Sequence, residues 1–158
     1  MQVAAHLKRD DRAVLPLGST EQHSHLRLTV DCILPERVAA DAAEPLGIPV
    51  FPVLSYGVTP YFREFPGSIS LRVETHLAVV RDILGGFALN GFRRIIVCSG
   101  LGGHGLGQKC AQAAAVDNPG VMVPFHKRRD ATKWRAGLQA DTAVDSTGEG
   151  GWKPRWAE

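Results

Sequence analysis

The sequence contains only three cysteines, Cys32, Cys98 and Cys110, an odd number set far apart among apolar residues. A disulfide framework is therefore not expected, and buried free thiols in a reducing cytoplasm are the favoured state. The sequence also lacks a run of about 18 consecutive apolar residues, so no membrane span is predicted. Its first residues lack the apolar core of a signal peptide. These features favour a cytoplasmic protein.

The sequence also lacks a large excess of either charge, because it has 18 basic and 16 acidic residues and a net charge of +2. A polyanionic partner is not required, and no nucleic-acid role is expected. The 158 residues, 44% of them hydrophobic, suffice for one domain with a real core. Residues 1–126 are predicted to form this α/β domain. Residues 127–158 are more basic and contain few aliphatic residues, and they are predicted to be a polar C-terminal tail.

Short apolar segments alternate with longer segments of helical pattern. The expected strands are residues 13–17, 48–54, 94–98 and 121–125, and the expected helices are residues 35–44, 75–89 and 107–116. This alternation predicts a three-layer α/β/α fold with a mostly parallel sheet. Ligands of such folds bind at the carboxyl ends of the strands, where residues 18–31 and 100–105 are expected to lie.

The segment from Gly18 to Asp31 has the composition of a metal site. Glu21, His23 and His25 fall within five residues, and Asp31 follows six residues later. Carboxylates and imidazoles together suit Zn, Mn or Fe(II), and a position left to water would give a Lewis acid and a nucleophile. The loop of residues 55–66 carries Tyr56, Tyr61 and Phe62, which could form the wall of a substrate pocket or simply pack.

Three motifs in order resemble the creatininase (creatinine amidohydrolase) family. They are Gly18-Ser-Thr-Glu-Gln-His-Ser-His-Leu-Arg followed by Asp31, Phe65-Pro-Gly-Ser68, and Gly91-Phe-Arg-Arg-Ile95. The resemblance implies a creatininase-like α/β fold, a homo-oligomer, and a metal-dependent amidohydrolase that acts on a small cyclic or linear amide. It also implies that Glu21, His23 and Asp31 bind one or two divalent ions.

The sequence departs from the family pattern at three places. Ser24 alone stands where the family has two residues between its histidines, which is a one-residue deletion. Leu101 occupies the position of a histidine ligand, and His104 follows three residues later. Relatives are longer and supply a further acidic ligand, for which Glu149 is the best candidate. His25 and His104 are the candidates for the catalytic proton donor.

Two other functions remain open. The chain could be a creatininase-like scaffold that has lost activity and acts through oligomer contacts. Alternatively, Gly100-Leu-Gly-Gly-His-Gly105 satisfies a dinucleotide-binding pattern, and the basic run of residues 127–129 could contact the 2′-phosphate of NADP. The remaining histidines lack acidic neighbours at useful spacing, and surface or hydrogen-bonded positions are expected for His6, His76 and His126.

Overall fold

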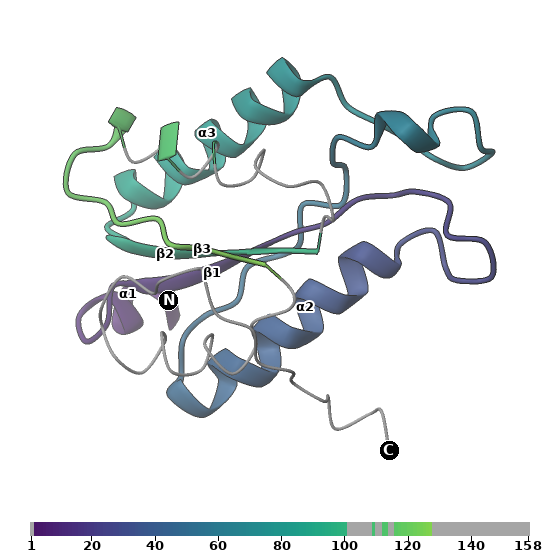
Figure 1. The fold of residues 1–158 in the computed structure, drawn as a ribbon. Coiled ribbons are helices and arrows are strands. Elements are labelled where there is room, and N and C mark those ends of the chain that lie inside the picture. Colours follow the sequence, from purple (N-terminus) through teal and green to yellow (C-terminus); the bar gives the residue numbers. More distant parts are fainter. Residues whose placement is uncertain (1, 101–108, 110–111, 114–115, 128–158) are drawn as a thin grey trace.

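The computed structural model describes residues 2–100, 109, 112–113 and 116–127 (Figure 1). Most of the glycine-rich turn, including Leu101 and His104, lies outside the described residues. The predicted tail lies outside them from residue 128 onward, and Glu149 with it.

A parallel sheet in the order β1-β2-β3 forms the centre of the fold. Strand β1 (Arg12–Leu17) pairs with β2 (Arg94–Ser99) over its whole length, from Arg12 opposite Arg94 to Leu17 opposite Ser99. The short strand β3 (Phe125–Lys127) continues the sheet beside the end of β2. The predicted strands 13–17 and 94–98 are therefore confirmed.

The expected strand 48–54 is not a continuous strand, although it lies beside the other edge of β1. It makes only two isolated parallel bridges, Val14 with Val50 and Leu17 with Leu54. Pro49 and Pro52 lack the N–H groups that a ladder needs, so hydrogen bonding is interrupted. The strand expected at residues 121–125 is displaced for a similar reason, because Pro124 separates the bridge at Met122 from β3.

Two long helices cover opposite faces of the sheet, α2 (Val30–Ala43) on one and α3 (Val73–Leu89) on the other (Figure 1). The alternation of side chains along β1 divides the core. Ala13, Leu15 and Leu17 pack with residues of α3, whereas Val14 packs with alanines of α2. This arrangement confirms the three-layer α/β/α prediction. The shorter helices are α1 (Gln2–Leu7), which was not expected, η1 (Glu44–Leu46) and η2 (Pro60–Phe62).

Helix α2 begins five residues before the predicted start at Pro35. Proline is favoured in the first turn of a helix, and the prediction used it as a start signal. Here Pro35 lies inside the helix and cannot donate a hydrogen bond to the Asp31 carbonyl. The extra turn brings Asp31, buried in the first turn of α2, close to the end of β1.

The first turn of α2 approaches both strand ends so closely that only glycine fits opposite it. A Cβ atom at Gly18, directly after β1, would lie 2.7 Å from the Asp31 carbonyl oxygen. A Cβ atom at Gly100, directly after β2, would lie 2.3 Å from the same oxygen and 2.8 Å from Cγ of Pro35. These two glycines therefore set the position of Asp31 relative to the sheet.

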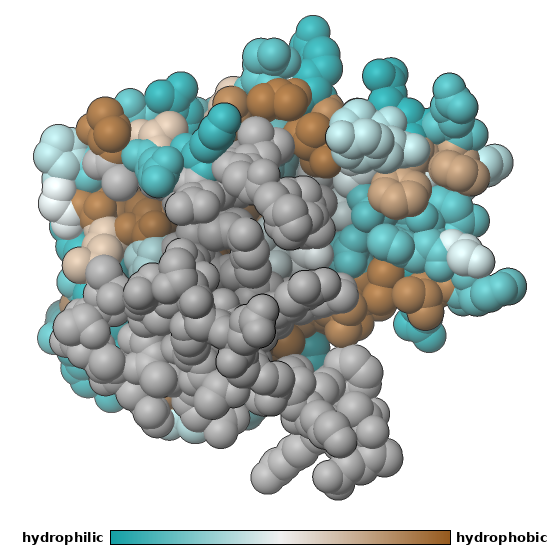
Figure 2. Space-filling view, viewed as in Figure 1, coloured by the Kyte–Doolittle hydropathy of each residue, from teal (hydrophilic) through white to brown (hydrophobic). Residues whose placement is uncertain are grey.

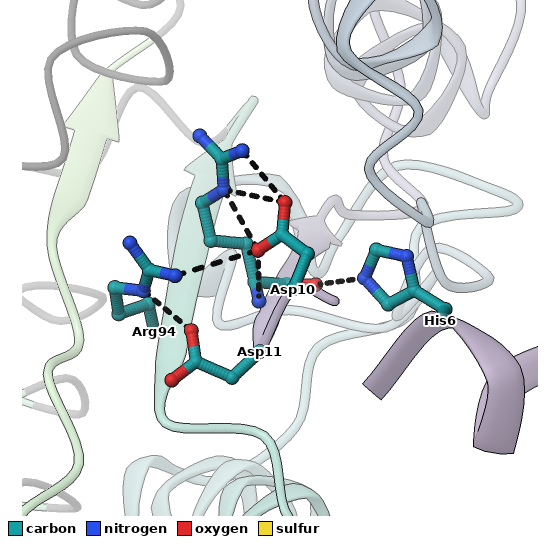
Figure 3. A network of polar contacts seen from close by, with 5 residues as sticks. His6, Asp10, Asp11 and Arg94 are labelled. Carbon is teal, nitrogen blue, oxygen red and sulfur yellow. Dashed lines mark hydrogen bonds and ion pairs between the residues drawn. The ribbon is translucent and has the colours of Figure 1, made fainter. Parts of the chain in front are cut away.

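At the opposite end of the strands, two neighbouring arginines are neutralised by two aspartates (Figure 3). Arg12 binds the Asp10 carboxylate through Nε and Nη2, and Arg94 binds Asp11 through Nε and Asp10 through Nη2. Burial alone would raise the pKa of Asp10, but the hydrogen bonds and charge of Arg12, together with Arg94, lower it overall. The network links the start of β2 to the residues that precede β1.

His76 is an exception in the core. Its side chain on α3 is fully buried, and neither ring nitrogen has a hydrogen-bond partner among the described residues. The expectation of a surface position is therefore wrong for His76, because this position belongs to the buried face of α3. Burial lowers the pKa of His76, and the nearby Tyr56 main chain opposes this effect only in part.

Replacement of Gly100 by alanine should destabilise the fold by about 1–3 kcal/mol, because the added methyl group must displace backbone or the Pro35 ring. Gly86→Ala is the matched control, since Gly86 lies within α3 and its Cβ would meet nothing within 4 Å. That substitution should stabilise the protein by about 0.5–1 kcal/mol. Urea denaturation of both variants tests the contact, and a Gly100→Ala protein as stable as wild type would contradict it.

Acid should destabilise the protein through His76. A histidine whose pKa is lowered on folding contributes stability that is present above its unfolded pKa, about 6.5, and is lost as the pH falls. His76→Leu should be about 1–3 kcal/mol more stable at pH 7.5, because it removes two buried ring nitrogens that have no close hydrogen-bond partner among the described residues. The difference should widen at pH 5.5. The unfolding free energies of wild type and His76→Leu should be measured at both pH values, with His25→Gln as the exposed control. A difference between His76→Leu and wild type that is the same at both pH values would contradict the prediction.

Candidate metal centre

Three side chains with ligand atoms converge at the carboxyl end of β1. Glu21 and His23 lie on the segment after β1, and Asp31 lies in the first turn of α2. One ligand atom from each lies within 4.8 Å of the other two. The structure thus brings together the three residues that the sequence selected as metal ligands. The one-residue deletion at Ser24 does not separate them, because α2 starts early enough to carry Asp31 to the others.

The imidazole of His23 lies between the two carboxylates. Its Nε2 atom is 2.9 Å from Oε1 of Glu21 and 2.9 Å from Oδ2 of Asp31. The hydroxyl of Ser19 donates a longer hydrogen bond, 3.4 Å, to the same Asp31 oxygen. Sequence reasoning missed Ser19, although its place in the Gly-Ser motif, two residues before Glu21, is a usable signal. Because two carboxylate oxygens lie this close to Nε2 of His23, a positive charge is favoured at this position.

The electrostatics of the cluster also favour a cation. Glu21 and Asp31 are both almost fully buried. Burial raises the pKa of Glu21, the hydrogen bond and charge of Asp31 raise it further, and His23 and Ser19 act in the opposite direction. Two buried carboxylates this close repel one another unless a proton or a metal ion lies between them.

Hydrogen bonds fasten the segment that carries the ligands to the 55–70 loop. The main-chain N–H of Gln22 donates a hydrogen bond to the Ser68 hydroxyl at 2.9 Å. The main-chain N–H of Ile69 donates one to the Thr20 carbonyl, also at 2.9 Å. The Thr20 hydroxyl donates to the Ser55 carbonyl, also at 2.9 Å. Two segments nearly 50 residues apart in the sequence therefore hold the site jointly, and both project from the same end of the molecule (Figure 1).

An aromatic side chain from this loop packs against the central imidazole. The ring centroid of Phe62, in η2, is 5.8 Å from that of His23, and Phe65 lies 6.3 Å beyond Phe62. The half-buried ring of Phe62 thus limits the orientations that His23 can adopt. Of the three aromatic residues named from the sequence as a possible pocket wall, Phe62 makes this contact, whereas the side chain of Tyr61 is 89% exposed.

Of the two candidate proton donors, His25 is not part of the cluster. His25 lies exposed in the turn after His23, next to Ser24, whose φ of 56° is in the left-handed region. Glycine is favoured in that region, and the creatininase pattern has a glycine in this part of the loop. His104, the other candidate, lies outside the described residues, as does Leu101.

The donor set suits a divalent metal ion. Two carboxylates and one imidazole are ligands that Zn, Mn and Fe(II) accept, and three protein ligands leave positions for water and substrate. Small adjustments of side chains suffice, because ligand atoms about 2.1 Å from an ion lie up to about 4.2 Å apart. The chemistry of the three residues therefore fits a hydrolytic metal.

A family model described as creatinine amidohydrolase matches residues 1–152. The chain is 37% identical over 93 residues to the creatinine amidohydrolase of Pseudomonas putida, a match that covers 55% of this chain and 36% of that protein. It is 33% identical over 106 residues to the 3-dehydro-scyllo-inosose hydrolase of Thermotoga maritima, which covers 66% of this chain and 33% of that protein. The matches thus span about a third of the length of these relatives.

Comparison of the fold with solved structures also gives creatininases. A solved structure of creatinine amidohydrolase (creatininase) superposes with a TM-score of 0.70 at 28% identity, covering 78% of this chain and 54% of that one. A manganese form of creatininase (TM-score 0.69, 27% identity) and a Zn–Zn form of a creatininase variant (TM-score 0.68, 27% identity) cover the same shares of the two chains.

Replacing Glu21 by glutamine should stabilise the protein in the presence of a chelator. A carboxyl whose pKa is raised on folding stabilises the fold below its ordinary pKa, and this contribution is lost as the pH rises through the folded value. At pH 7 the thermal midpoint of Glu21→Gln should therefore exceed that of wild type by a few degrees, and zinc should raise it less. Glu64→Gln, which alters an exposed carboxylate, is the control. An unchanged midpoint for Glu21→Gln would contradict the repulsion between the carboxylates.

Proposed function

Because the chain belongs to the creatininase family, we propose that it is a metal-dependent amidohydrolase that cleaves the C–N bond of a small cyclic or linear amide. The observation that carries the proposal is the convergence of Glu21, His23 and Asp31. Zn or Mn is the favoured ion, since creatininase structures exist in zinc and manganese forms, and Fe(II) suits the same ligands.

In this proposal Glu21, His23 and Asp31 would hold one or two divalent ions. When bound, such a metal would polarise the amide carbonyl and lower the pKa of a coordinated water toward neutrality. The chain's own contribution is to keep both carboxylates buried and the His23 ring fixed. Ser19 orients Asp31 through its hydroxyl, and Phe62 restrains His23 by ring packing.

Hydrolysis of an amide also requires a proton for the leaving nitrogen. We propose His25 for this role, because its exposed imidazole lies two residues from His23 and is available to a bound substrate. His104 is the second candidate. A role for His25 predicts that its loss lowers turnover without loss of metal.

Two further properties belong to the same proposal. Family membership supports a homo-oligomer, and the buried free thiols of Cys32 and Cys98 suit a cytoplasmic location. None of the helices in the described part of the chain has the length and hydrophobicity that crossing a bilayer requires.

The alternative is an inactive creatininase-like scaffold, which the replacement of a ligand histidine by Leu101 favours. Metal binding separates the two functions, because a scaffold that has lost its site would hold no stoichiometric metal. A nucleotide-binding protein would instead bind NADPH, and that binding would be lost in Gly102→Val.

The test is the metal content of the protein purified without a histidine tag. We expect close to one or two equivalents of Zn, Mn or Fe, reduced at least tenfold in His23→Ala and Asp31→Ala, since each substitution removes a direct ligand. His25→Ala is the control and should retain the metal while slowing hydrolysis of a small cyclic amide about 100-fold. Wild-type protein without metal after supplementation with all three ions would overturn the amidohydrolase and support the scaffold.

A further inference from the structure

An apolar rim borders the three candidate ligands. It consists of Leu26 and Leu28 on the ligand segment and of Phe62, Phe65 and Ile69 on the 55–70 loop. Four of the five side chains are more than a third exposed, at 60% for Leu26, 37% for Leu28, 52% for Phe65 and 48% for Ile69. In the space-filling view, hydrophobic surface appears at this end of the molecule beside polar surface (Figure 2). Large exposed apolar side chains next to a polar centre commonly mark a ligand-binding surface.

The rim is built as one unit with the metal centre. Leu28 packs so closely on Gly67 that a Cβ atom there would lie 2.8 Å from a Leu28 methyl carbon. The Leu28 carbonyl accepts a hydrogen bond from the Glu21 amide at 2.9 Å, which closes the ligand segment on itself. On the other side, Phe62 contacts the His23 ring and Phe65 contacts Phe62. An apolar group held by the rim would therefore lie directly beside the ligand atoms.

The charged residues of the rim do not favour a charged substrate. Arg27 lies between the two leucines, and Arg63 and Glu64 lie between the two phenylalanines, all three exposed to solvent. Charges of both signs thus occur in the segments that carry the rim, and the ring of Phe62 packs against His23. Among the described residues, substrate selection would thus rest on shape and hydrophobic contact.

We propose that the apolar rim binds an apolar ring of the substrate, so that the site prefers amides with an aromatic or aliphatic ring to small polar amides. This inference rests on the proposed amidohydrolase function and specifies its substrate class. Phe62 and Phe65 are the specificity-determining residues, and the scissile amide is held at Glu21, His23 and Asp31.

Hydroxamates test the proposal, because their metal-binding group mimics a hydrated amide while the attached body can be varied. The dissociation constants of benzohydroxamate and acetohydroxamate are measured by calorimetry on zinc-loaded protein whose metal content is known. Benzohydroxamate should bind about tenfold more tightly, the factor that one well-packed aromatic contact gives. Phe65→Ala should reduce this ratio to about threefold or less, and Phe62→Ala should do the same.

The controls separate the rim from the metal centre. Tyr61→Ala removes a side chain of the same loop that is 89% exposed, and it should leave the ratio unchanged. Phe62→Leu keeps an apolar side chain and should retain part of the preference. Equal affinities for the two hydroxamates, or a ratio unaffected by both alanine substitutions, would overturn the proposal that the rim binds a ring. Neither result would count against the proposed metal site. Protein that takes up no zinc would overturn the proposed function, and the rim proposal with it.

Discussion

The first turn of α2 lies against the ends of β1 and β2 at a separation that leaves no room for a Cβ atom. Gly18 and Gly100 provide this space, and both face the carbonyl oxygen of Asp31. The early start of the helix, the burial of Asp31 and its distance to His23 all depend on this contact. A larger residue at either position would move the helix away from the sheet and Asp31 away from Glu21. The geometry of the candidate metal centre is thus a consequence of how a helix packs on two strand ends.

The same packing places two carboxylates close together, which lowers the stability of the folded state. Glu21 and Asp31 are buried with one imidazole between them, and burial and the charge of Asp31 both oppose ionisation of Glu21. A protein without a ligand for this position would be more stable with an amide or an apolar residue there. Functional sites commonly retain such unfavourable groups, because a bound ion converts the repulsion into coordination. By contrast, the aspartates at the other end of the strands are neutralised by arginines.

The sequence was informative where the physical cause is local. β-branched and apolar runs predicted β1 and β2, and helical spacing predicted α3 to within two residues at its start. The predictions failed where tertiary packing or proline changed the outcome. Pro49 and Pro52 interrupt the segment beside β1, and Pro35 lies inside a helix that the strand ends hold in place. The burial of His76 was missed, although its spacing from Val80, Leu84 and Phe87 places it on the buried face of α3. At the site, spacing in the sequence pointed to Glu21, His23, His25 and Asp31, and the resemblance to the creatininase motif selected Glu21, His23 and Asp31 as the metal ligands. The contacts of Ser19 and Phe62 required the folded chain, since they come from neighbours in space.

The most direct test of this account is a crystal structure of the protein with zinc, with diffraction data collected on both sides of the zinc absorption edge. The account predicts an anomalous peak about 2.0–2.2 Å from a carboxylate oxygen of Glu21, from Nε2 of His23 and from a carboxylate oxygen of Asp31. A fully loaded crystal whose zinc lies elsewhere, or whose zinc is not bound by Asp31, would contradict it.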